Sequence, residues 1–113
     1  MNPKGALTAL VLSMLLTGSL SVGAARKKTV QKIKVACVGN SITYGTGIQD
    51  REHFSYPVQL QKMLGDKYLV GNFGKPGATL LRHGHRPYMQ QEEYKQAMAF
   101  KGDIAVIHLG IND

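Results

Sequence analysis

Residues 33–41 read IKVACVGNS, an apolar and β-branched run that closes on glycine and then turns polar. Such a run is typical of a buried β-strand. Two later stretches repeat the pattern, because residues 67–74 read KYLVGNFG and residues 103–110 read DIAVIHLG. The sequence therefore predicts three buried strands, each followed by a loop that begins at a glycine.

Two segments between these strands have a helical pattern. Residues 56–64 place apolar side chains three and four positions apart and are followed by Gly65, which predicts a helix that ends there. Residues 88–100 bring Tyr94 and Met98 to one face of a second predicted helix. Alternation of strands and helices predicts an α/β fold in which right-handed crossovers join parallel strands.

The loops after the three strands carry the candidate functional residues. They contain Ser41, Gly77 and Asn112 respectively. Reactive sites in parallel α/β sheets lie at the carboxyl ends of the strands, so we expect the three loops to converge. Each residue also has an ordinary alternative: Ser41 as a helix N-cap, Gly77 in a Pro-Gly turn, and Asn112 in an Asn-Asp turn.

Taken together, the three loops resemble a known family. Residues 39–43 (GNSIT) look like the first sequence block of the SGNH (GDSL-like) hydrolases, with Asn40 where many members have Asp. Residues 74–79 (GKPGAT) resemble the second block, and residues 110–113 (GIND) are similar to the third. The resemblance implies a three-layer, flavodoxin-like fold with a parallel sheet, here truncated after the third strand.

The resemblance also implies a mechanism. Ser41 would attack an ester carbonyl, and the N–H groups of Ser41 and Gly77 together with the amide of Asn112 would hold the oxyanion. No metal or organic cofactor is implied. The expected substrate is an O-acetyl or similar ester, on a carbohydrate such as sialic acid or xylan. Alternatives are a lysophospholipase or thioesterase of the same family, and a non-catalytic glycan-binding remnant; a nucleotide-binding module has no phosphate-binding motif to support it.

A serine nucleophile needs a base, which this family carries in an Asp-x-x-His block near its C-terminus. Residues 50–53 spell DREH, but so soon after the nucleophile they predict a surface loop. We expect His83 and His85 to be solvated and His108 to be structural. No such block follows the third strand up to Asp113, so residues 1–113 alone are expected to be a poor esterase.

Residues 1–25 have the charged, apolar and small-residue order of a secretory signal peptide, with cleavage expected after Ala24 or Ala25. Their apolar core is shorter than the roughly 20 residues of a membrane-spanning helix, so no stable membrane anchor is expected. Residues 26–113 then form the hydrolase part, located in the periplasm or outside the cell. The lone Cys37 predicts no intrachain disulfide.

The chain has 14 basic and 7 acidic residues, and much of the excess lies in residues 26–34. A short basic run of this kind is more often a solvated lead-in than a binding patch. Zinc-ligand spacing and aromatic stacking repeats are absent from the sequence, so nucleic acid is not an expected partner.

Overall fold

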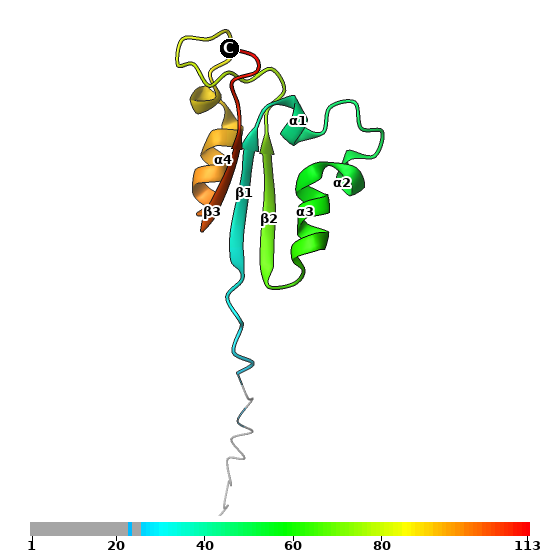
Figure 1. Cartoon of the computed structure of the whole chain (residues 1–113). Helices are drawn as coiled ribbons and strands as arrows, with labels where there is room; N and C mark the ends of the chain where they lie inside the picture. The colour runs from blue at the N-terminus through cyan, green and yellow to red at the C-terminus, as the bar shows by residue number, and fades with distance from the viewer. Residues whose placement is uncertain (1–22, 24–25) are drawn as a thin grey trace, which may run out of the picture.

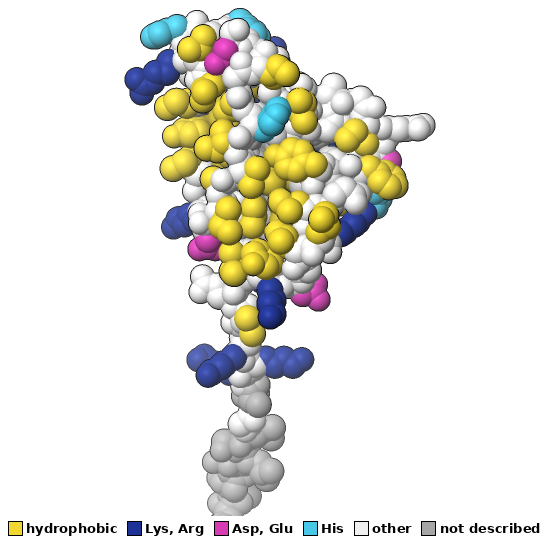
Figure 2. Space-filling view, in the orientation of Figure 1, with side chains coloured by type: hydrophobic (Ala, Val, Ile, Leu, Met, Phe, Trp, Pro, Cys, Tyr) yellow, Lys and Arg dark blue, Asp and Glu magenta, His cyan; other side chains and the backbone are white. Residues whose placement is uncertain are grey.

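The computed structural model describes Gly23 and residues 26–113. The predicted signal peptide therefore lies, apart from Gly23, outside the described residues. In the part of the chain that is described, no helix combines the length and apolarity needed to cross a membrane. Residues 26–32 lead into the fold as an exposed segment, and Figure 2 shows Lys and Arg side chains standing out from it.

The described sheet contains β1 (Ile33–Gly39), β2 (Tyr68–Gly74) and β3 (Ile104–His108). Its order is β2-β1-β3, and both pairings are parallel. All three strands run in the same direction in Figure 1 and end at the same edge of the sheet. The register pairs Gly39 with Gly74 on one side and with His108 on the other, so the three strand ends are level. The three predicted strands are confirmed.

The helices differ from the prediction in two places. The segment predicted as one helix is divided into η1 (Tyr88–Gln90) and α4 (Glu92–Phe100), because Gln91 has an extended backbone with ψ 156°. Two one-turn helices, α1 (Ser41–Tyr44) and α2 (Arg51–Phe54), precede the helix expected over residues 56–64. The surface loop expected at residues 50–53 therefore contains most of α2, whose four residues form a single helical turn.

Helices cover both faces of the sheet, which gives three layers. Adjacent strand residues point to opposite faces. The ring of Phe73 packs against Phe100 of α4 at 5.2 Å between centroids, whereas the neighbouring Asn72 donates to the backbone of α1. The helix α3 (Tyr56–Leu64) packs on β2, on the side of α1 in Figure 1 and away from α4. The arrangement matches the predicted flavodoxin-like layering.

The strand β3 was predicted to be buried, and this is wrong for the described chain. All five of its side chains are exposed, including Ile104 at 47% and Ile107 at 66%. β3 is an edge strand, so no described strand covers its outer side. Hydrophobic side chains gather on this part of the surface in Figure 2. A cavity of about 360 Å³ lies beside it, lined by Ala36 of β1, Met98 of α4 and Ile107 among others.

Candidate active site

The turn after β1, which we call the nucleophile turn after its candidate nucleophile Ser41, is built by Asn40 rather than by Ser41. The Oδ1 of Asn40 accepts a hydrogen bond from the Ile42 N–H at 3.1 Å, which makes Asn40 the N-cap of α1. Ser41 is then the first residue of the helix and is half-buried. The alternative of Ser41 as the cap is therefore wrong, and its hydroxyl makes no hydrogen bond to any described residue.

Two glycines let α1 lie directly over the strand ends. A Cβ on Gly39 would collide with the side chain of Thr43 and would come within 2.8 Å of the His108 carbonyl oxygen. A Cβ on Gly74 would collide with the backbone of Tyr44. Any side chain at either position would lift the nucleophile turn from the sheet, so both sites require glycine.

Hydrogen bonds join the second loop to the nucleophile turn. The Lys75 N–H donates to the Gly39 carbonyl oxygen at 2.9 Å. The amide of Asn72 donates to the Thr43 carbonyl oxygen at 2.8 Å, and its Oδ1 accepts from the Gly74 N–H at 3.0 Å. Asn72 thus bridges the end of β2 and α1 through its one side chain.

The third loop is attached to the other two. The Asn112 amide donates to the Ala78 carbonyl oxygen at 3.0 Å. A carboxylate oxygen of Asp113 accepts from the Leu80 N–H at 2.7 Å. At the base of this loop, the Asn40 N–H donates to the His108 carbonyl oxygen at 3.3 Å. Backbone and side-chain hydrogen bonds therefore show the convergence of the loops that the parallel topology predicts.

The site predicted from the sequence contains three donors at this edge. Among the described contacts, the backbone N–H groups of Ser41 and Gly77 have no hydrogen-bond acceptor. Asn112 donates one of its two amide hydrogens to the second loop, which leaves the other hydrogen available. Available donors at the carboxyl edge of a parallel sheet suit an oxyanion. Asn112 bonds to the second loop, but no described hydrogen bond joins Ser41, Gly77 and Asn112 to one another.

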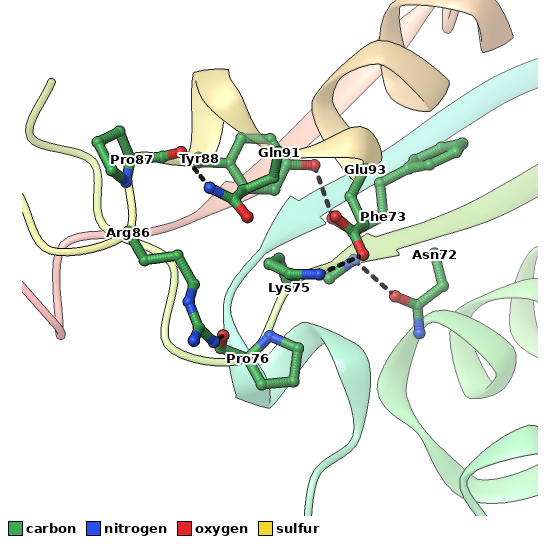
Figure 3. Close-up of polar contacts among 10 residues, drawn as sticks. Asn72, Phe73, Lys75, Pro76, Arg86, Pro87, Tyr88, Gln91 and Glu93 are labelled. Atoms are coloured by element: carbon green, nitrogen blue, oxygen red, sulfur yellow. Dashed lines mark hydrogen bonds and ion pairs between the residues drawn. The ribbon is translucent and has the colours of Figure 1, made fainter.

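Several residues that fix the second loop were not singled out from the sequence. Figure 3 shows Lys75 pointing at Glu93 of α4, with 3.1 Å between Nζ and the carboxylate. The Tyr88 hydroxyl donates to the Phe73 carbonyl oxygen at 2.6 Å. Burial, and then the charge of Glu93, raise the pKa of Tyr88, so its hydroxyl keeps the proton that it donates. These partners come from far along the chain, and no local pattern marks them.

Comparison with known proteins identifies the family. The sequence profile of the GDSL-like lipase/acylhydrolase family matches residues 37–113. The chain belongs to this family. An acetylxylan esterase of Xylanibacter ruminicola is 54% identical over 81 residues, which are 72% of this chain and 17% of that protein. The chain therefore spans less than a fifth of that relative. No solved structure matches the chain.

The four histidines of this GDSL-like chain are exposed. His53 pairs with Asp50 at 2.9 Å, and its side chain is 68% exposed. His83, His85 and His108 are also exposed. Among the described contacts, none of the four forms a hydrogen bond with Ser41.

The described part of this GDSL-like chain contains neither a metal site nor a reactive cysteine. Within it, no group of three or more His, Cys, Asp or Glu side chains is close enough to share a metal ion. Cys37 is fully buried, and burial raises the pKa of its thiol, which disfavours the reactive thiolate. Cys37 packs as a small apolar side chain.

Proposed function

We propose that this chain supplies the nucleophile and the oxyanion donors of a serine esterase that removes O-acetyl groups from carbohydrate. The observation that carries the proposal is the hydrogen-bonded junction of the three loops that hold Ser41, Gly77 and Asn112. The identity to an acetylxylan esterase favours xylan over sialic acid as the acetylated glycan.

The chemistry follows acyl transfer. The Ser41 hydroxyl oxygen attacks the acetyl carbon and passes its proton to a base, and the carbonyl electrons move onto oxygen. The N–H groups of Ser41 and Gly77 and the amide of Asn112 hold that oxyanion; one such donor is worth about 10²–10³ in rate. The sugar oxygen then leaves with the proton from the base. Water attacks the acetyl-Ser41 ester in the same way and releases acetate.

The base is proposed to come from residues outside this sequence. No described histidine is bonded to Ser41, and the related esterase is several times longer than the matched region. A general base contributes about 10²–10⁴ in rate, so residues 1–113 alone are expected to be weak catalysts. We also propose that residues 1–25 direct export, which would bring the enzyme to a polymeric substrate that does not enter cells.

The test begins with the DNA downstream of the Asp113 codon. The full gene product is expressed and assayed for release of acetate from acetylated xylan and for hydrolysis of p-nitrophenyl acetate. We expect Ser41→Ala to abolish both activities. Thr46→Ala, which removes an exposed hydroxyl from the same turn, is the matched control and should retain them.

The alternatives give different results in the same assay. A lysophospholipase or thioesterase would prefer long acyl chains, whereas the proposed enzyme loses rate as the acyl group grows beyond acetyl. A glycan-binding remnant would bind xylan equally well with and without Ser41 and release no acetate. Either outcome would overturn the proposal.

A further inference from the structure

The proposed oxyanion role of Gly77 requires that its backbone N–H is held in one direction. Its backbone lies in the left-handed region with φ 76°, and glycine is the least restricted residue. An oxyanion donor must be aimed before the reaction begins, since reorienting it during the reaction would cost the free energy that it is meant to supply. Some contact must therefore hold the peptide plane that carries the Gly77 N–H.

That plane is shared with the carbonyl group of Pro76. The Pro76–Gly77 peptide bond is trans, like every described peptide bond, so its C=O and N–H lie in one rigid plane and point in opposite directions. Fixing the carbonyl oxygen of Pro76 consequently fixes the direction of the Gly77 N–H.

Arg86 makes the contact that fixes this carbonyl. Its Nη1 donates to the Pro76 oxygen at 2.8 Å, and Figure 3 shows the side chain reaching across to the proline. Among the described contacts, no other donor reaches this oxygen. The guanidinium also lies 3.2 Å from the place where a Cβ of Gly77 would be, so it borders the glycine itself.

The backbone of Arg86 is itself held in place. Its carbonyl oxygen accepts from the Thr79 N–H at 2.8 Å, and the Tyr88 N–H donates back to the Thr79 carbonyl at 2.9 Å. Thr79 is fully buried and forms a parallel bridge with Pro87. The guanidinium therefore projects from a fixed point and not from a free loop.

We propose that Arg86 is a positioning residue that aims and polarises the Gly77 N–H for the oxyanion. A hydrogen bond from a permanent cation is stronger than one between neutral groups, and it draws electron density through the amide toward the carbonyl oxygen. Hydrogen bonds in series polarise one another, so the N–H on the other side of the same amide becomes a better donor. This inference rests on the proposed esterase function.

The test uses three variants of the full gene product. Arg86→Met keeps the length of the stem and removes every donor. Arg86→Lys restores a cation with a donor. Arg82→Met is the matched control, because Arg82 belongs to the same loop but forms no hydrogen bond or ion pair with a described residue.

Two readouts are measured, namely kcat and KM for p-nitrophenyl acetate, and the ¹H–¹⁵N signal and hydrogen exchange of the Gly77 amide. Removing a whole oxyanion donor costs about 10²–10³ in rate, and misaiming one is expected to cost less, about tenfold in kcat. Arg86→Met should show that loss with KM unchanged, an upfield shift of the Gly77 proton and slower base-catalysed exchange, because a less polarised N–H is less acidic. Arg86→Lys should recover most of kcat, and Arg82→Met should match the wild type.

The outcomes separate this inference from the proposed function. If wild type and Ser41→Ala hydrolyse the ester equally, the esterase proposal fails, and the Gly77 signal alone decides whether Arg86 positions that amide. If the wild type is active but Arg86→Met changes neither kcat nor the Gly77 signal, the inference is wrong. A lower unfolding midpoint in Arg86→Met with kcat and KM unchanged would show a structural role only, and would also refute it.

Discussion

Replacing Gly74 with alanine tests whether close backbone contact holds the nucleophile turn. The added methyl would meet the backbone of Tyr44, which cannot move aside as a flexible side chain would. Overpacking of this kind costs about 1–3 kcal/mol. The strand end and α1 must separate, which also strains the bond from Asn72 to Thr43, worth about 1 kcal/mol. We expect the free energy of unfolding to fall by about 2–4 kcal/mol.

The assay is urea denaturation followed by circular dichroism, with Gly47→Ala as the matched control. Gly47 has φ 83° and open space around its Cα, so alanine there meets backbone strain alone, about 1–2 kcal/mol. Gly74 is not in the left-handed region, so its penalty is purely steric. If Gly74→Ala were no more destabilising than Gly47→Ala, the close-contact reasoning would be refuted. The esterase rate of Gly74→Ala should also fall, since Ser41 moves with α1.

Two further predictions concern buried hydroxyl and thiol groups. Tyr88→Phe removes the donor to the Phe73 carbonyl oxygen at a site only 3% exposed. We expect the free energy of unfolding, measured by urea denaturation, to fall by about 1–2 kcal/mol. An unchanged free energy would show that this hydrogen bond does not stabilise the fold. Burial raises the pKa of the Cys37 thiol above its ordinary 9.0, and that of Tyr88 above 10.0, so the folded chain keeps protons that the unfolded chain releases. The free energy of unfolding should therefore fall as pH rises through the ordinary pKa values of the two groups. Cys37→Ala should lessen this fall between about pH 7.5 and about pH 10. Equal slopes of free energy against pH in the wild type and Cys37→Ala would refute the prediction.

The regular elements could be predicted because short-range patterns specify them. Each strand lies in a short, mostly apolar stretch followed by glycine, and β1 and β2 end at the glycines that the pattern predicts. The helix over residues 56–64 has the expected bounds, because its apolar period and Gly65 both mark its end. The order of the elements then implied parallel pairing, and with it the edge at which the loops meet.

The remaining features depend on contacts that the local sequence does not encode. Asn40 and Ser41 are both good N-caps, and only the path of the turn decides that Asn40 takes this role. The break at Gln91 lies within the polar residues 90–93, where no apolar side chain reports the helical period, so periodicity could not reveal it. Arg86 reaches Pro76 from ten residues away because the bonds of Thr79 fold the loop back, and neither spacing nor composition predicts that reach.

The paired glycines at the ends of β1 and β2 have a consequence for how this enzyme could change over time. Because the helix that begins at Ser41 rests on bare backbone at these two positions, the height of Ser41 above the sheet does not depend on the size of any side chain there. Substitutions among the apolar residues deeper in the sheet can alter packing and stability while leaving the Ser41 hydroxyl where it is. The apolar residues of the sheet can therefore vary in sequence, whereas the two glycines under the helix cannot.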